Sequence, residues 1–416
     1  MKGTRGDQRD RGTIGKPRTS GARKTQGSRG KLMQMFQGKP IYLDYNATTP
    51  IDPRVAEAML PYLLEHFGNP SSSHVYGRKA KEAVDKARTQ VAEMLGCREE
   101  EIVFTSGGSE SNNYAIKGIA RALRSRGRHL VASTIEHPAV TEVCRHLEEE
   151  GFRTTLVPVD GNGRVDPRDV EAAITAETIL ISIMHANNEV GTIQPVEEIS
   201  RIAHSRGILV HSDAAQSVGK IPVRVHELGV DLLSVAGHKL YAPKGIGALF
   251  VRSGVQPDKL LDGANHEMNR RAGTENVAQI VGLGEACAMV RENQSSYEAH
   301  LRRMRDRLEE GLAARLSEVR VHGHPRERIP NTSSLGFRGL SATQILSELR
   351  TVAASAGAAC HSDHVCVSGV LQAMQVPLEY AVGTIRFSVG RFTSADEVDT
   401  AVREIAAVVA RLRQGR

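Results

Sequence analysis

Residues 104–113, Phe-Thr-Ser-Gly-Gly-Ser-Glu-Ser-Asn-Asn, join the end of an apolar strand to the start of a helix. A glycine turn at such a junction leaves free backbone amides at the positive end of the helix dipole, which favours phosphate binding. Gly107 and Gly108 let the backbone approach closely, and Ser109 adds a hydroxyl. The alternative is an ordinary strand–turn–helix with a serine cap. No Gly-Lys-Ser/Thr follows, so this is not a Walker nucleotide loop.

Short apolar runs alternate with helical patterns on both sides of this junction. Helical patterns such as 80–95 and 195–204 separate the runs. This alternation predicts an α/β fold with a mostly parallel, seven-stranded sheet and helices on both faces. The runs that predict strands are residues 101–106, 129–133, 155–159, 179–184, 208–211, 232–236 and 248–252.

A charged amphipathic segment, residues 292–316, follows the predicted sheet and indicates a long helix that leads into a second domain. We expect that domain to be smaller and α+β, with strands near 333–337 and 384–389 and a last helix over 394–412. The predicted organisation is a disordered basic tail (1–37), a large domain (49–295) and a small domain (38–48 with 296–416).

Composition limits the functional classes. Residues 1–32 contain ten Lys or Arg and two Asp, a net charge of +8, so the chain's formal charge of +6 leaves about −2 for the rest. The basic tail therefore explains the high pI, and nothing points to nucleic-acid binding by the core. The tail lacks the apolar region of a secretion signal, and an alternative is that translation starts at Met33 or Met35.

Two further features bear on the compartment. The chain has no apolar run of about 18 residues, so no membrane span is expected. Its five cysteines are few and mostly scattered, which argues against a disulfide framework and favours a reducing, cytoplasmic setting.

Two more segments place polar residues where predicted strands end. Asp213 in His-Ser-Asp-Ala-Ala-Gln has three alternative roles: metal ligand, cap, or partner of a heterocyclic nitrogen. Lys239 follows a buried strand within Gly-His-Lys, an unusual place for lysine. A phosphate turn, an Asp and a buried Lys are together the parts of a pyridoxal-phosphate site, with Lys239 as the covalent anchor. Lys244 is a competing anchor, and a surface loop lysine is the alternative reading.

Eight segments resemble the signature blocks of the cysteine desulfurase and selenocysteine lyase family, which is class-V aminotransferase-like. They cover residues 40–412 in order: YLDYNATTP, TSGGSESNN, IEHPAV, HANNEVGTIQP, HSDAAQSVGK, GHKLYAPKGIGAL, RRAGTENV and IRFSVGRFT. The resemblance implies the fold type I of pyridoxal-phosphate-dependent transferases and a homodimer.

The resemblance also implies roles for individual residues. Lys239 would bind pyridoxal 5'-phosphate and move protons, and Asp213 would pair with the pyridine nitrogen. His137 would stack on the ring and assist proton transfer. Arg386 would bind the substrate carboxylate. The remaining implied contacts are to the ring hydroxyl and substrate (Gln216, Asn188) and to the phosphate (Gly108, Ser109, His238, and Thr274 from the partner subunit).

One position departs from the family pattern. Many relatives have Ser two residues before the His of Gly-His-Lys, where this chain has Ala236. The departure predicts the loss of one phosphate contact, which Ser234 is not expected to replace.

Cys360 lies in the segment Ser-Ala-Gly-Ala-Ala-Cys-His-Ser-Asp-His, residues 355–364. Its position matches the family's active cysteine, whose thiolate takes sulfur from the substrate, and His361 or His364 would lower its pKa. Two alternatives remain for the residue types here. Cys360, His361, His364 and Cys366 are a candidate zinc set with an unusual spacing, and Cys366 is a candidate resolving thiol.

The predicted function is conversion of L-cysteine to L-alanine, with the sulfur passing to Cys360 as a persulfide and then to an acceptor protein for iron–sulfur clusters or thiolation. The alternative is a selenocysteine lyase that converts L-selenocysteine to L-alanine and selenide. The loop around Cys360 resembles the corresponding loop of selenocysteine lyases. Pro138 argues against that alternative, because selenocysteine-selective relatives carry an acidic residue directly after the stacking histidine, His137 in this chain. No resident metal, nucleic acid or membrane is expected as a partner.

Overall fold

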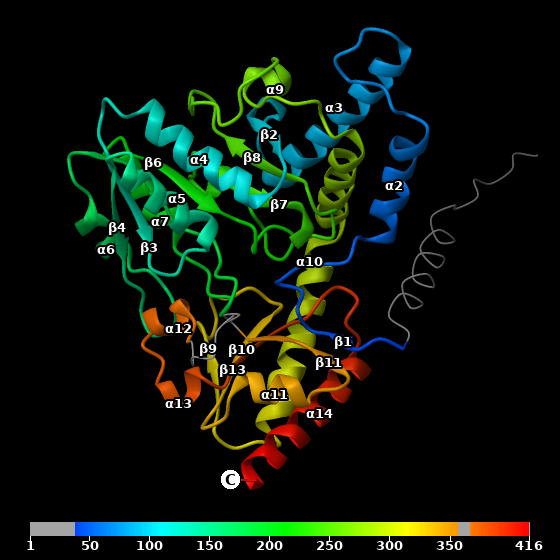
Figure 1. The fold of residues 1–416 in the computed structure, drawn as a ribbon, viewed down its shortest axis with the longest axis vertical. Coiled ribbons are helices and arrows are strands. Elements are labelled where there is room, and N and C mark those ends of the chain that lie inside the picture. Colours follow the sequence, from blue (N-terminus) through cyan, green and yellow to red (C-terminus); the bar gives the residue numbers. More distant parts are fainter. Residues whose placement is uncertain (1–37, 357–366, 416) are drawn as a thin grey trace, which may run out of the picture. The chain divides into compact units, whose positions relative to one another are not determined.

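The computed structural model describes residues 38–356 and 367–415. Its largest sheet has seven strands in the order β2-β8-β7-β6-β5-β3-β4 (Figure 1). Strand β8 runs antiparallel to its neighbours, and the other neighbouring pairs are parallel. The predicted mostly parallel, seven-stranded sheet is therefore confirmed. The strands are β2 (Ile102–Thr105), β3 (His129–Ser133), β4 (Arg153–Val157), β5 (Thr178–Ser182), β6 (Leu209–Asp213), β7 (Leu232–Ala236) and β8 (Gly247–Val251).

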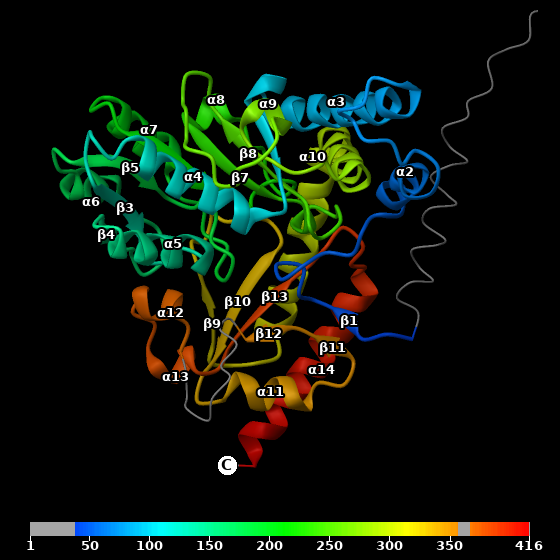
Figure 2. The ribbon, with the colours of Figure 1, turned by 45° about the horizontal axis from the view of Figure 1, so that its top comes forward.

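Both faces of the sheet are buried over its inner strands and β2, which explains why these strands are largely apolar, whereas the edge strand β4 is mostly exposed. Successive side chains point to opposite faces, so Val103 packs in one cluster and Phe104 in the other. Helices α3 (Val75–Leu95), α7 (Val196–His204) and α10 (Val277–Ala313) cover the face of Phe104. Helices α4 (Gly108–Ala122) and α5 (Pro138–Glu149) cover the opposite face (Figure 2).

Three helices begin in the same way, with a capping side chain followed by proline at the first helical position. They are α2 (Pro53–Leu64), α5 and α6 (Pro167–Ala173), capped by Asp52, His137 and Asp166. The cap accepts a hydrogen bond from a free backbone N–H, and proline has no N–H to leave unpaired there. His137 is therefore fixed by the start of its helix.

A second, antiparallel sheet has the order β12-β13-β10-β9 and forms the lower part of Figure 1. Its separate core includes Leu308 of α10, Phe337, Phe387 and Ile405. The remaining elements are β1 (Ile41–Tyr42), β9 (Val319–His322), β10 (Thr332–Phe337), β11 (Val352–Ala353), β12 (Ser355–Ala356), β13 (Thr384–Ser388), α8 (Val225–Leu228), α9 (His266–Asn269), α11 (Ala342–Glu348), α12 (Gly369–Ala373), α13 (Leu378–Ala381), α14 (Ala395–Gln414) and the 3-10 turns η1 (Glu99–Glu101) and η2 (Gly237–Lys239).

Helix α10 starts at Val277, well before the residue 292 expected from the charge pattern. Its first half is apolar because Ile280 and Leu283 are buried against the large sheet, whereas Leu301 and Leu308 belong to the second core. The proposed domain boundary at 295–296 thus falls inside one continuous helix, and the division itself remains a proposal. The predicted tail, 1–37, lies outside the described residues.

Within residues 38–356 and 367–415, no helix is both long enough and apolar enough to cross a bilayer.

Candidate active site

The predicted site residues follow the carboxyl ends of the strands of the large sheet. Asp213 is the last residue of β6, Lys239 ends η2 directly after β7, and His137 follows β3. In open α/β sheets this edge is where ligands bind. The order of the strands in the sheet therefore brings together site residues that lie far apart in the chain.

The glycine turn after β2 forms the start of α4, as predicted. Gly107 has a φ of 151°, a conformation that favours glycine, and α4 begins at Gly108 without a side-chain cap. A Cβ on Gly108 would come within 3.2 Å of the Ala236 Cβ, so the two residues pack closely. Glu110 steadies the turn by accepting a hydrogen bond from the Ser106 N–H at 2.8 Å. The uncapped amides remain available to an anion.

Asp213 is buried, with 8% of its surface exposed, and both carboxylate oxygens accept hydrogen bonds. The Asn112 Nδ2 donates to Oδ2 at 2.7 Å, and the Ala215 N–H donates to Oδ1 at 2.9 Å. These two donors fix the plane of the carboxylate. Asn112 belongs to the quoted glycine-turn segment but was not predicted as a site residue, and its Oδ1 is buried without a partner.

Lys239 lies close to other charged groups. Its Nζ donates to the backbone oxygens of Asn46 at 2.5 Å and Ala47 at 2.8 Å. Burial lowers the pKa of the Lys239 ammonium to about 8; Arg386 lowers it further, while Asp213 and Asp44 oppose the shift. A lysine with a lowered pKa presents more neutral amine at neutral pH, as a covalent anchor requires. The competing candidate, Lys244, is exposed.

His137 lies near the Asp213 carboxylate and the Lys239 amine. Its Nδ1 accepts the Ala139 N–H at 3.1 Å, so a neutral ring carries its proton on Nε2. Burial lowers the pKa of His137, Asp213 opposes that shift, and Lys239 adds to it. The preceding residue, Glu136, is buried, and burial raises its pKa to about 8. Sequence reasoning did not assign Glu136 a role.

Arg386 is in β13, so the second sheet supplies it. Only 6% of its surface is exposed, and its Nη2 pairs with Asp44 Oδ1 at 2.7 Å. Its Nη1 donates to the Asn188 backbone oxygen at 3.1 Å, while its Nε is buried without a partner. Asp44 lies in the quoted segment YLDYNATTP but was not predicted as a site residue. Asn188 contacts Arg386 through its backbone.

Gln216 and His238 border Lys239. The Gln216 Nε2 donates to the same Asn46 oxygen that Lys239 contacts, at 3.1 Å. The His238 Nδ1 lies 3.1 Å from the Thr48 hydroxyl, and burial lowers its pKa to about 4, with Lys239 adding to the shift. Ser234 is fully buried, and its hydroxyl lies 3.0 Å from His211 Nε2.

Two of the predicted site residues are exposed, and a third lies outside the described residues. Ser109 is exposed at the start of α4, and Thr274 is exposed on the segment before α10. Cys360 lies outside the described residues, together with His361, His364 and Cys366. Among the residues that are described, no cluster of His, Cys, Asp or Glu has a geometry suited to a metal ion.

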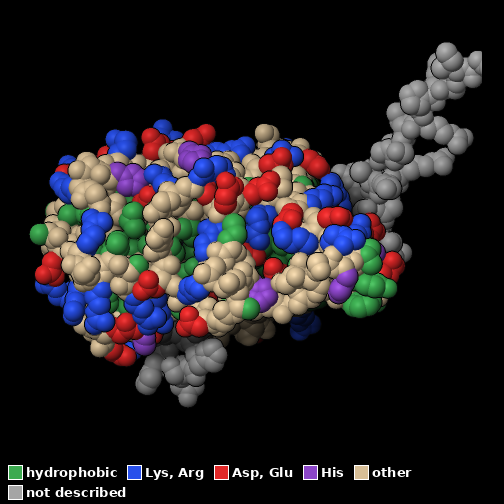
Figure 3. Space-filling view, turned by 90° about the horizontal axis from the view of Figure 1, so that it is seen from above, with side chains coloured by type: hydrophobic (Ala, Val, Ile, Leu, Met, Phe, Trp, Pro, Cys, Tyr) green, Lys and Arg blue, Asp and Glu red, His purple; other side chains and the backbone are tan. Residues whose placement is uncertain are grey.

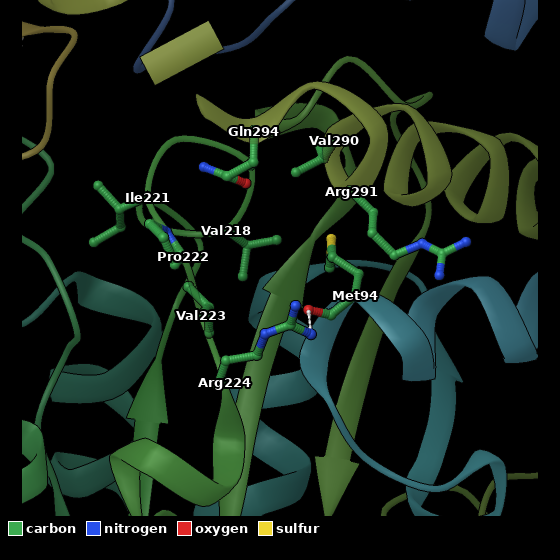
Figure 4. A pocket seen from close by; sticks show the side chains of 10 residues that line it. Met94, Val218, Ile221, Pro222, Val223, Arg224, Val290, Arg291 and Gln294 are labelled. Carbon is green, nitrogen blue, oxygen red and sulfur yellow. Dashed lines mark hydrogen bonds between the residues drawn. The ribbon is translucent and has the colours of Figure 1, made fainter. Parts of the chain in front are cut away.

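A small pocket elsewhere, of about 70 Å³, is not this site (Figure 4). Apolar side chains such as Val218, Val223 and Val290 line much of it, and Arg224 closes one side by donating to the Met94 backbone oxygen at 3.3 Å. None of the predicted site residues lines it.

Comparisons with known proteins identify the family of this chain. The model of the aminotransferase class-V family matches residues 41–401, which gives the class of protein. A cysteine desulfurase IscS from Dictyoglomus turgidum is 46% identical over 377 residues, covering 90% of this chain and 96% of the relative. A cysteine desulfurase from Rattus norvegicus is 43% identical over 379 residues, covering 90% and 84%.

Solved structures give the same result. A NifS-like protein, 36% identical, superposes with a TM-score of 0.84 and covers 89% of this chain and all (100%) of that chain. A structure described as SspA in complex with cysteine is 34% identical with a TM-score of 0.73, covering 85% and 99%. This chain therefore belongs to the cysteine desulfurase family of class-V aminotransferases, which are pyridoxal-phosphate-dependent enzymes.

The residues present fit that cofactor. The uncapped start of α4 suits a phosphate, the Asp213 carboxylate suits a protonated ring nitrogen, and Lys239 has the lowered pKa of an amine anchor. The unpartnered buried atoms Asn112 Oδ1 and Arg386 Nε are further polar groups available to a bound molecule.

Proposed function

We propose that this enzyme converts L-cysteine to L-alanine and transfers the sulfur to Cys360 as a persulfide. The observation that carries the proposal is the convergence of Lys239, Asp213 and His137 at one edge of the sheet, with Arg386 reaching in from the second sheet. Bound pyridoxal phosphate supplies an electron sink for the electrons released at the substrate carbon. The protein's own groups must bind, orient and move protons.

Each group has a role that follows from its surroundings. The Asp213 carboxylate would pair with the protonated ring nitrogen, because its two hydrogen bonds hold it in place. The Lys239 amine removes and returns a proton at the substrate carbon, and its lowered pKa makes the neutral base available. The His137 Nε2–H assists proton movement, since Nδ1 is occupied by the Ala139 amide.

Arg386 is the proposed site for the substrate carboxylate. Its Nε is buried without a partner and its Nη1 bonds only a neutral carbonyl, so the guanidinium has donor capacity left for a substrate carboxylate. Asp44 holds Nη2, the nitrogen that shares an edge with Nε, at 2.7 Å. The substrate would thus complete a hydrogen-bonding pattern that the folded protein leaves open.

Cys360 is the proposed nucleophile on the grounds of its motif. Its thiolate attacks the substrate sulfur, an S–S bond forms, and the C–S bond breaks with its electron pair remaining on the substrate β-carbon. Protonation of the β-carbon, with return of the proton that Lys239 removed from the α-carbon, gives alanine. The sulfur then leaves Cys360 for a cytoplasmic acceptor protein of iron–sulfur or thiolation pathways.

The test is alanine release from cysteine and from selenocysteine, measured side by side with a reductant. Lys239→Ala should lose covalent cofactor and all turnover, and Lys244→Ala is the matched control. Cys360→Ala should keep the colour of the bound cofactor but lose desulfuration of cysteine. Full activity of Cys360→Ala on cysteine would contradict the nucleophile assignment, and a hundredfold preference for selenocysteine, about 2.7 kcal/mol, would favour the lyase.

A homodimer is the second part of the proposal. Six large apolar side chains lie on α2, at the start of α3 or between the two helices, and each has 49% to 78% of its surface exposed. Such a concentration is typical of an interaction surface. Figure 3 shows hydrophobic side chains at the right-hand end of one face, the end where α2 lies in Figure 1. We define this apolar patch as Leu60, Leu63, Leu64, Phe67, Val75 and Tyr76.

A second copy of the chain is the proposed occupant of the apolar patch, because exposed Thr274 is expected to complete the partner's phosphate site. Leu64→Glu combined with Phe67→Glu should convert a dimer to a monomer, measured by size-exclusion chromatography with light scattering. Leu156→Glu, at an exposed leucine on β4 outside the apolar patch, is the control that should stay dimeric. A monomeric wild-type enzyme would contradict this part.

A further inference from the structure

Lys220 is a buried lysine whose hydrogen-bond partners are both amides. Only 5% of its surface is exposed, in the segment between β6 and α8. Its Nζ donates to Gln216 Oε1 at 2.6 Å and to Asn46 Oδ1 at 3.0 Å. Burial lowers its pKa well below the usual range, and the nearby cations Lys239 and Arg386 add to that shift. A lysine is rarely buried without a carboxylate partner, so this arrangement calls for an explanation.

The contact determines the orientation of the Gln216 amide. Lys220 Nζ donates to the Gln216 side chain, so the atom at 2.6 Å is the Gln216 oxygen; the ammonium form has no acceptor. At the other end the Gln216 Nε2 donates to the Asn46 backbone carbonyl, which can only accept. Both contacts require the same amide orientation. Lys239 Nζ contacts that same carbonyl at 2.5 Å, so the NH₂ group of Gln216 lies beside the anchoring lysine.

The second contact orients the Asn46 side chain by the same logic. Its Oδ1 accepts from Lys220 and from Asn331 Nδ2 at 2.9 Å, which leaves Nδ2 as the donor to the Asn188 backbone oxygen at 3.1 Å. That oxygen also accepts from Arg386 Nη1. One buried lysine therefore orients two amides, one beside Lys239 and one that braces the carbonyl contacted by Arg386.

We propose that Lys220 is a positioning residue that locks the Gln216 amide with its NH₂ group toward the ring oxygen of bound pyridoxal phosphate. The inference rests on the proposed cofactor site. A donated hydrogen bond stabilises the anionic ring oxygen, which weakens its hold on the proton shared with the lysine-linked nitrogen. Without Lys220 only the Asn46 carbonyl still orients the amide, so the amide rotates more readily to present its oxygen, and the proton is then held more tightly.

The experiment is a pH titration of the visible absorption band of the purified holoenzyme. Lys220→Met, which keeps the length of the side chain and removes the donor, should raise the midpoint of this titration by about one pH unit, the size expected for one hydrogen bond. Lys244→Met removes an exposed lysine near the same turn and should leave the midpoint unchanged. A Lys220→Met midpoint equal to that of the wild type overturns the proposal.

A double-mutant cycle separates positioning from a direct effect of charge. Gln216→Met should raise the midpoint by itself, and adding Lys220→Met should then change nothing further. If Lys220→Met shifts the midpoint equally in both backgrounds, the lysine acts through its charge and the proposal is wrong. Loss of the band in Lys239→Ala supports the proposed cofactor site, whatever the Lys220 variants show. A band that persists in Lys239→Ala contradicts the proposed site.

Gln216→Glu tests the same orientation in a protein that keeps Lys220. One carboxylate oxygen would bond Lys220, and the other would occupy the place of the NH₂ group. An acceptor then replaces a donor, so the midpoint should rise more than in Gln216→Met. A midpoint equal to that of the wild type would show that the NH₂ group does not face the ring, even if Lys220→Met fails to fold.

Discussion

Two arginine–carboxylate pairs, each with a buried arginine, contrast a structural role in one region with the binding role proposed for the other. Arg88 and Glu267 form a closed pair: Nη2 meets Oε1 at 2.7 Å and Nη1 meets Oε2 at 2.9 Å. Glu267 also accepts the Phe104 N–H, and the Arg88 guanidinium lies 4.7 Å from the Phe104 ring centroid. The pair holds residues 267–269 at left-handed φ values of 48°, 57° and 63°, which are costly for non-glycine residues.

Arg386 and Asp44 form an open pair. A single contact of 2.7 Å joins them, and the Arg386 Nε is buried without a partner. Leaving a buried donor unsatisfied costs stability, and such exceptions concentrate at functional sites. The difference between the pairs therefore lies in the unused donor, which a substrate carboxylate can satisfy.

The largest expected effect comes from removing the open arginine. Arg386→Gln should lower kcat/KM for cysteine about 10³-fold, or about 4 kcal/mol, because the charged contact to the substrate carboxylate is lost. Thermal unfolding should change little, since Asp44 is partly accessible to water. Steady-state kinetics with Arg403→Gln, an exposed arginine on α14, as control would check this. A variant that loses stability but keeps kcat/KM would reverse the comparison.

The closed pair should show the opposite profile. Glu267→Gln should lower the free energy of unfolding by about 3 kcal/mol, because it leaves a buried arginine uncompensated. The KM for cysteine should stay near that of the wild type. Urea denaturation checks the first statement, with Glu142→Gln on the exposed face of α5 as control. A raised KM with unchanged stability would mean that this pair also serves binding.

The sequence predicted the parts of the site that local chain geometry determines. The glycine turn, Asp213 and Lys239 each follow a buried strand, so apolar runs and turn residues were sufficient to find them. Asp44 and Asn46 were missed, because their partners are distant: Asp44 lies 342 residues from Arg386, and Asn46 lies 174 from Lys220. Such pairs depend on how the second sheet packs against the first. No local pattern in one sequence encodes that packing.

Burial and, after it, the open arginine lower the pKa of Lys239. With a pKa lowered to about 8, the amine is neutral above pH 8 and increasingly protonated below it. The rate at which apoenzyme attaches pyridoxal phosphate should therefore fall about tenfold per pH unit below 8 and level off above it. Stopped-flow absorbance measures this rate. In Arg386→Gln the midpoint should move to higher pH, because Arg386 contributes to the lowering; an unchanged midpoint would mean that burial alone sets it.

The smallest expected effect tests what Asp44 contributes to the open pair. Asp44→Asn keeps an oxygen acceptor for Arg386 Nη2 but removes a negative charge near the bound carboxylate, so KM for cysteine should fall by about two- to threefold. Asp44→Ala removes the acceptor as well, which frees the guanidinium to turn, and KM should rise about tenfold. The two variants differ only in whether Arg386 is held in place. If both variants raise KM equally, the negative charge of Asp44, and not its oxygen as an acceptor, holds Arg386 in place. The open pair would then differ from the closed pair in its charge balance and not in its unused donor.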